Sequence, residues 1–207
     1  MENKNRKFNL KFGYQDKENP DIFHREVVIS KRPTAEDLME ILAFDGASSD
    51  IQINLSLIAK SISVFGTLGM PVSITVLLSL NEIDENKLNE EYLMFLLSTQ
   101  PETEQKVLED NRAQLAFGIE RKGVKYHTVE FGNLLNGYDR IKLSEDSQNN
   151  TEYSALKIGR EVVGLSTLDG EKSVSGELTL DEIKAMDVTD FMTLREAESQ
   201  WLDSFRD

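Results

Sequence analysis

Cysteine is absent from this sequence, tryptophan occurs once, and the only histidines are His24 and His127. Without cysteine, neither a disulfide framework nor a thiolate zinc site can form. The sequence also lacks the phosphate-binding P-loop, the dinucleotide-binding glycine motif, Gly-x-Ser-x-Gly and His-Glu-x-x-His. Paired acids such as Glu90-Glu91 suit the first turn of a helix, where the macrodipole favours negative charge. We therefore expect a protein without a catalytic site, a metal or another cofactor.

Positive charge is scarce as well. The chain has 23 lysines and arginines against 37 aspartates and glutamates, which gives a net charge of −14. Because such a surface repels phosphate backbones on average, we expect no nucleic-acid partner. The same charge keeps a protein soluble and favours a basic partner.

Long hydrophobic runs are also missing. A membrane-spanning helix needs about 18 or more consecutive apolar residues, and the sequence contains no such run, so we expect no membrane partner. No apolar core follows the polar stretch Met1–Arg6, so we expect no secretory signal peptide. With 39% hydrophobic and 29% charged residues, the composition fits an ordinary soluble globule of 207 residues.

Two stretches one hundred positions apart, Ser79–Leu93 and Thr179–Met192, share one pattern. Each starts with a hydroxyl residue and has Glu three positions later, which is the spacing of a capping box at a helix start. A further capping residue ten positions on predicts a second helix in each stretch. The predicted caps are Ser79, Glu82 and Asn89 in the first stretch, and Thr179, Glu182 and Thr189 in the second.

Weaker matches upstream follow the same order, at offsets that drift from 105 to 100. They pair Leu10–Tyr14 with Leu115–Ile119, Phe23-His24 with Tyr126-His127, Thr34–Asp37 with Asn136–Asp139, and Leu57–Leu68 with Leu156–Leu168. Their common order predicts an internal duplication, in which both histidines occupy matching hairpin positions. The alternative is two unrelated α+β segments that share helix-capping chemistry.

The hydrophobic patterns predict an α+β fold of two tandem, similar lobes, each with a β-hairpin followed by several helices. Apolar residues alternate with polar ones over Phe8–Tyr14 and Leu115–Ile119, and a second strand follows each at Glu26–Ile29 and Lys125–Phe131. We place the first lobe at residues 1–100 and the second at 101–207. A linker helix is predicted at about residues 101–114.

The other predicted elements are mostly helices. Thr34 is the predicted cap of one helix, and residues 51–65, 153–165 and 189–205 have apolar residues near helical spacing. Residues 71–78 are compatible with strand or helix, and their β-branched content favours a strand or an exposed apolar segment.

Two apolar groups are candidate protein-binding residues. Trp201, Leu202 and Phe205 lie close together near the C-terminal end, where a chain is usually frayed unless it is docked. The alternative is that these side chains close the core of the second lobe. The second group comprises Val72, Ile74 and Val76.

Three segments resemble one protein family. Ser30–Leu38, with Pro-Thr-Ala-Glu-Asp-Leu, precedes an apolar helix and then Leu78–Leu93, with Leu-Asn-Glu-Ile-Asp. This order is similar to that of the tail assembly chaperones of contractile-tailed bacteriophages, and Leu178–Leu194 repeats the same ending. The chain also resembles phage baseplate-hub assembly proteins, which share the two-part layout. The full second copy departs from many such chaperones, which have a single copy.

The resemblance implies a non-enzymatic role in tail morphogenesis. A chaperone would bind the helical tape-measure protein in the host cytoplasm until tail-tube subunits polymerise around it. A baseplate-hub subunit would instead stay in the virion and bracket neighbouring subunits. From a different class, a cytoplasmic acidic regulatory binding module is a further alternative.

Overall fold

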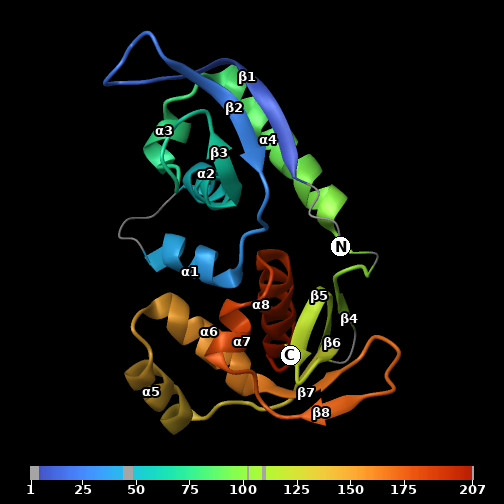
Figure 1. The fold of residues 1–207 in the computed structure, drawn as a ribbon. Coiled ribbons are helices and arrows are strands. Elements are labelled where there is room, and N and C mark those ends of the chain that lie inside the picture. The colour runs from blue at the N-terminus through green and yellow to red at the C-terminus, as the bar shows by residue number, and fades with distance from the viewer. Residues whose placement is uncertain (1–4, 44–48, 102, 109–110, 207) are drawn as a thin grey trace. The chain divides into compact units, whose positions relative to one another are not determined.

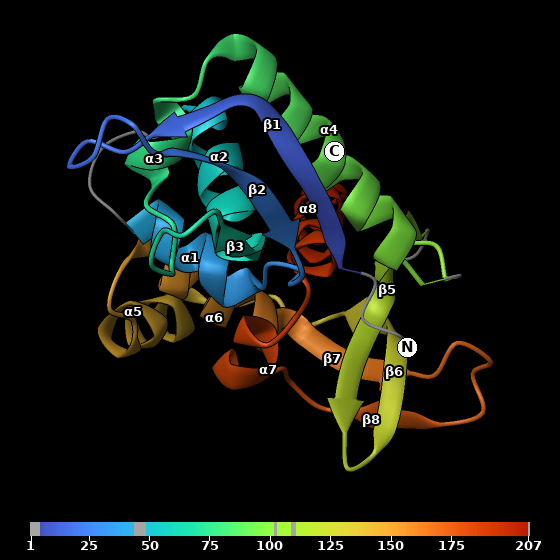
Figure 2. The same ribbon diagram turned by 45° about the horizontal axis from the view of Figure 1, so that its top comes forward.

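The computed structural model describes residues 5–43, 49–101, 103–108 and 111–206, which form two compact units (Figures 1 and 2). Unit 1 comprises the described residues of 1–33 and 44–100, and unit 2 comprises those of 34–43 and 101–207. Each unit combines helices with an antiparallel sheet, which confirms the expected α+β class.

Unit 1 consists of a small antiparallel sheet and the helices packed on it. Its elements are β1 (Arg6–Gln15), β2 (Phe23–Ile29), α2 (Asp50–Ser61), β3 (Ile62–Phe65), α3 (Ile74–Leu78) and α4 (Glu82–Thr99). The described strands have the order β1-β2-β3, and α4 lies along β1 (Figure 1). Buried side chains such as Leu55, Phe65 and Leu88 form the core between sheet and helices.

Unit 2 repeats this plan with a larger sheet. Its strands are β4 (Lys106–Leu108), β5 (Arg112–Arg121), β6 (Val124–Phe131), β7 (Val162–Ser166) and β8 (Ser173–Ser175), in that spatial order. Its helices are α1 (Ala35–Ala43), α5 (Gly137–Asp146), α6 (Asn150–Glu161), α7 (Leu180–Lys184) and α8 (Val188–Asp203). The long helix α8 packs on β4 and β5, as α4 packs on β1 in unit 1.

Helix α1 comes from the first half of the chain but belongs to unit 2. Thr34 forms an isolated β-bridge with Asp187, and the N–H of Ala35 donates to the carbonyl oxygen of Met186 at 2.9 Å. The side chain of Leu38 on α1 is buried, and α1 contacts α6, α7 and α8. The predicted division at residue 100 is therefore wrong for α1, which precedes residue 100 but packs in unit 2.

The hairpins of the two units are equivalent at a glycine bulge. Each first strand is interrupted at a glycine with positive φ, +79° at Gly13 and +72° at Gly118. A Cβ atom would approach a carbonyl oxygen of the paired strand to 2.4 Å at Gly13 and 2.6 Å at Gly118, so a side chain does not fit. The sequence match between Leu10–Tyr14 and Leu115–Ile119 is thus an equivalence in the fold.

A buried aspartate on the long helix binds each bulge. The Asp84 carboxylate accepts hydrogen bonds from three successive N–H groups of β1, at 2.7, 3.0 and 2.8 Å. The Asp190 carboxylate accepts three from β5, at 2.7, 2.9 and 2.9 Å. The donors are Lys11, Phe12 and Gly13 in unit 1, and Ala116, Phe117 and Gly118 in unit 2. This shared device supports the predicted duplication.

The environments of the two aspartates differ in one respect. Burial opposes ionisation of Asp84, but the backbone hydrogen bonds outweigh it and hold its pKa below the usual value. At Asp190 burial prevails over the same three bonds and raises the pKa.

The predicted register of the duplicated helices is wrong by six residues. Asp84 and Asp190 are equivalent and lie 106 positions apart, whereas the sequence match used an offset of 100. The helix that follows α3 is also one continuous helix, α4, where two were expected. Asn81 caps α4 and Asp187 caps α8, each three positions before the aspartate that binds the bulge.

Four predicted caps are consequently misplaced. The Ser79 hydroxyl donates to the carbonyl of Val76 at 2.7 Å and ends α3. Glu82 is the first residue of α4, and Asn89 lies in its interior. Thr189 lies in the first turn of α8, because Asp187 is the better cap and precedes it by two residues.

The remaining caps are formed as expected. Thr179 and Glu182 make a reciprocal capping box at the start of α7. The Thr34 hydroxyl accepts from the N–H of Asp37, whose carboxylate accepts from the Thr34 N–H at 2.9 Å. Asn136 makes a capping box at the start of α5, so the two stretches matched in the sequence start helices in the same way.

The predicted helices at 51–65 and 153–165 are each too long. Both end four residues earlier, and the chain continues directly into a third strand, β3 or β7. Residues Ile62 and Val162 pair with the last residues of β2 and β6. These strands are too short to establish an alternation that distinguishes them from a final helical turn.

Two further segments differ from prediction. Residues 106–108 form β4, and Arg112 begins β5, so the described part of 101–114 contains no linker helix. Residues 74–78 form the short helix α3, although their β-branched content favoured a strand. Ser73 caps α3, and this capping interaction favours a helix over the strand that the β-branched residues prefer.

The histidines do not occupy equivalent positions. His24 pairs with Tyr14 across the first hairpin, whereas Tyr126 pairs with Ile119 across the second. Tyr126 is therefore the counterpart of His24, and His127 is one residue out of register. His24 is buried, while His127 is half-buried.

Candidate protein-binding surfaces

The C-terminal aromatic residues lie beside the sheet of unit 2. Trp201 is only 7% exposed and stacks on Phe131 of β6, with ring centroids 5.7 Å apart. Phe205 contacts the indole edge-to-face, also with centroids 5.7 Å apart, but remains 59% exposed. Leu202 is half-buried. The predicted trio thus divides into a core residue, Trp201, and an exposed aromatic residue, Phe205, which Trp201 supports.

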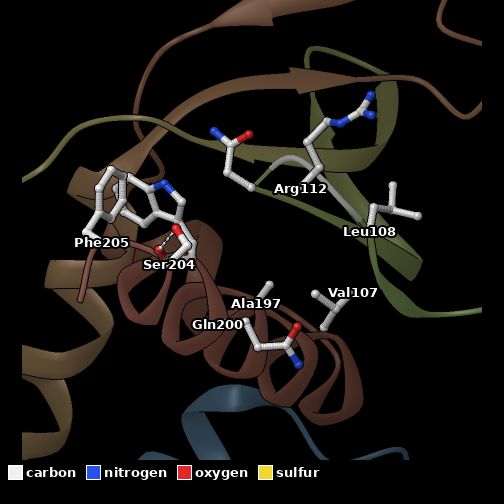
Figure 3. Close-up of a pocket in the computed structure, with 9 residues that line it drawn as sticks. Val107, Leu108, Arg112, Ala197, Gln200, Ser204 and Phe205 are labelled. Carbon is white, nitrogen blue, oxygen red and sulfur yellow. Dashed lines mark hydrogen bonds between the residues drawn. The ribbon is translucent and has the colours of Figure 1, made fainter. Parts of the chain in front are cut away.

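A cleft of about 580 Å³ opens between the end of α8 and the edge of the sheet (Figure 3). Phe205 lies at one end of this cleft, and Val107 and Leu108 of β4 lie at the other. The lining residues are Val107, Leu108, Asn111, Arg112, Ala197, Gln200, Trp201, Ser204 and Phe205. Apolar walls interrupted by amide, hydroxyl and guanidinium groups suit a protein segment with apolar side chains and a polar backbone.

The backbone at the cleft is fixed by local hydrogen bonds. Asn111 has a positive φ of +59°, and its carbonyl oxygen accepts from the Phe131 N–H at 2.9 Å. The Asn111 side-chain amide donates to the carbonyl of Phe131. Since Phe131 also stacks on Trp201, the cleft wall and its aromatic floor are connected. These contacts hold the Asn111 wall of the cleft in place.

The second predicted group, Val72, Ile74 and Val76, does not form a surface. Val72 is buried, and the other two are half-buried against the same core of unit 1. These side chains pack inside unit 1, where α3 contacts α2. Sequence reasoning instead missed an exposed apolar group on α4, formed by Leu93, Met94 and Leu97.

A buried group of charges lies between α6 and α8. The Lys157 ammonium is 3.3 Å from the Glu161 carboxylate and also contacts the Glu198 carboxylate. Glu161 is almost fully buried. Burial raises the pKa of Glu161 to about 7, Lys157 opposes this rise, and the negative Glu198 adds to it. The equivalent positions in unit 1 are Leu57, Ser61 and Tyr92, so this charge cluster is particular to unit 2.

Glu161→Gln should therefore change how stability depends on pH. The pKa of Glu161 is higher in the folded state than in the unfolded chain, so its favourable contribution is fully present below about 4.5 and is lost as pH rises through about 7. Relative to the natural protein, the variant should gain about 1–3 kcal/mol of unfolding free energy between pH 5.5 and pH 8. Urea denaturation at both pH values measures this gain.

The exposed Glu145 of α5 supplies the matched control. Glu145→Gln should shift the unfolding free energy by a similar small amount at both pH values. An unchanged difference between Glu161→Gln and the natural protein across this range would contradict the raised pKa.

Within the described residues, no three His, Cys, Asp or Glu side chains are grouped so that they could hold a metal ion. None of the described helices has the length and apolarity needed to cross a membrane. No protein-family model, curated protein or solved structure matches this chain.

Proposed function

We propose that this protein is a non-enzymatic morphogenesis protein of contractile-tailed bacteriophages that binds another tail protein in the cleft beside Phe205. The observation that carries the proposal is an exposed aromatic side chain fixed against a buried one at the end of a cleft. Exposed aromatic residues backed by well-packed side chains are frequent centres of protein interfaces.

Within that role we favour a tail assembly chaperone. Its partner, the tape-measure protein, is a long helical chain with apolar faces that need cover before the tail tube forms. The cleft offers an apolar wall at Val107 and Leu108 and an aromatic one at Phe205, which suits one apolar stripe of such a helix. The net charge of −14 keeps the complex soluble. The chaperone would act in the host cytoplasm.

Phe205→Ala is the direct test of this proposal. Because Phe205 is mainly exposed, its loss should change the unfolding free energy by less than about 1 kcal/mol. Binding to the tape-measure protein should weaken by roughly 30-fold or more, as for an interface hot spot. Isothermal titration calorimetry with purified tape-measure fragments measures the binding, and urea denaturation measures the stability.

Met192→Ala is the matched control, because Met192 is 49% exposed on α8, the helix that precedes Phe205, but does not line the cleft. Its binding should equal that of the natural protein. Equal affinities for Phe205→Ala and the natural protein would show that the cleft is not the binding site. Absence of binding to tape-measure, tail-tube and baseplate proteins alike would refute the tail function itself.

A baseplate-hub subunit that stays in the virion is the second candidate, because two similar units in one chain suit a bracket between neighbouring subunits. Mass spectrometry of purified particles separates the two roles. A chaperone should be missing from mature particles, whereas a hub subunit should be present in a fixed number of copies. A cytoplasmic regulatory module would be missing from particles and would bind no tail protein.

A further inference from the structure

The two sheets differ at their outer edge. In unit 2, β4 pairs antiparallel with the start of β5, and Val107 lies opposite Ala113. In unit 1, β1 is the edge strand, and no strand of the described residues pairs with its outer side. An open edge presents unpaired backbone groups that another chain can bind.

The hairpin register identifies which part of β1 corresponds to the site of β4. Phe8 pairs with Val27 as Ala113 pairs with Val129, at the offset of 105 that relates Gly13 to Gly118. The three residues of β5 that pair with β4 therefore correspond to Lys7, Phe8 and Asn9. The far part of β1 is closed to a partner, because Asp84 already accepts its N–H groups.

The helix beneath this edge exposes a methionine where unit 2 has a glutamine. Val107 of β4 lies over α8 at Ala197 and Gln200, which line the same cleft. Through the equivalence of the two aspartates, Gln200 corresponds to Met94 of α4, and Ala197 corresponds to Glu91, whose carboxylate pairs with Arg6 and Lys87. Met94 is 48% exposed. Glu90, one helical turn earlier on the same face, is also exposed and adds a negative charge.

From this correspondence we infer that unit 1 binds an extended segment of a partner protein, which pairs with Lys7–Asn9 of β1 as an added strand and covers Met94. Residues directly opposite each other on paired strands face the same side of a sheet. The residue opposite Phe8 therefore faces α4 and should be apolar, as Val107 is in β4.

This surface is independent of the cleft in unit 2, so the two proposals can fail separately. A blocked-end peptide with the sequence of residues 103–108, which contains Lys106-Val107-Leu108, is the probe. Added to the full-length protein, it should shift the amide resonances of Lys7, Phe8 and Asn9 and the methyl resonance of Met94. Amide hydrogen exchange at those residues should slow by at least tenfold at saturation.

Substitutions at Met94 and in the peptide test whether the two are in contact. Met94→Asp should weaken peptide binding at least tenfold, as should aspartate at the Val107 position of the peptide. Met192→Asp, at a similarly exposed methionine of unit 2, should leave peptide binding unchanged. Both methionines are exposed, so circular dichroism should show both variants folded.

Three results would overturn the inference. The first is the absence of resonance shifts at several millimolar peptide. The second is a set of shifts confined to residues 112–114, which would mean that the peptide replaces β4 in unit 2. The third is protection of Lys7–Asn9 that depends on protein concentration without peptide, which would mean that a second copy covers this edge. Phe205→Ala should not alter any of these measurements.

Discussion

Asp190→Ala should lower the free energy of unfolding of unit 2 by roughly 3–5 kcal/mol, because it leaves three backbone donors without an acceptor. The carboxylate is fully buried and binds the N–H groups of Ala116, Phe117 and Gly118. Each buried donor left unsatisfied costs about 1–3 kcal/mol, less where water enters the space. Guanidinium denaturation, followed by circular dichroism and by Trp201 fluorescence, measures the loss.

The equivalent substitution in unit 1 tests whether the two aspartates stabilise their bulges to the same extent. Asp84→Ala should cost a comparable amount, but without shifting the Trp201 transition, because the single tryptophan lies in unit 2. The exposed Asp181 is the control, and its alanine variant should stay within about 0.5 kcal/mol. A loss below about 1 kcal/mol for both buried aspartates would refute their role in holding the bulges.

The hairpins and their repetition could be predicted from the sequence. The shared Leu-x-Phe-Gly pattern reports a bulge that only glycine can form, so its two occurrences are strong markers. The helix register was misjudged because hydroxyl residues and glutamates are frequent at many helix starts. A better marker was present, namely Asn or Asp followed three positions later by Asp, at Asn81 and Asp84 and again at Asp187 and Asp190.

The exchange of α1 and the third strands could not be deduced locally. The helices that α1 contacts are α6, α7 and α8, more than one hundred residues along the chain. A capping box at Thr34 specifies where a helix starts but not which core it joins. Likewise, Ile62 and Val162 are strand residues because they pair with the ends of β2 and β6, which are distant in the sequence.

For the candidate surfaces, the sequence indicated the region but not the role of each residue. Trp201 and Phe205 are both apolar aromatic residues, and the sequence does not show that Trp201 is buried against Phe131 while Phe205 stays exposed. Met94 was missed because α4 has apolar residues on several faces, so no single stripe stands out. The equivalent position in unit 2 lies beside β4, and unit 1 has no strand there among its described residues.

Trp201→Ala should lower the free energy of unfolding by about 3–5 kcal/mol, because it removes a large buried side chain and leaves a cavity beside β6. The substitution also removes the stacking partner of Phe131 and the surface on which Phe205 rests, so both rings lose packing. Urea denaturation followed by far-ultraviolet circular dichroism measures the effect, since the variant lacks tryptophan fluorescence.

The comparison with Phe205→Ala separates the two roles of these neighbouring rings. Trp201→Phe should recover most of the stability, because it refills much of the cavity and keeps an aromatic contact with Phe131. Phe205→Ala should spare stability and weaken partner binding. If Trp201→Ala instead kept full stability and lost only binding, the indole would be a contact residue, and the cleft would need Trp201 rather than Phe205 at its centre. If it lost stability while partner binding persisted at low temperature, the indole would serve only to hold the end of α8 on the sheet.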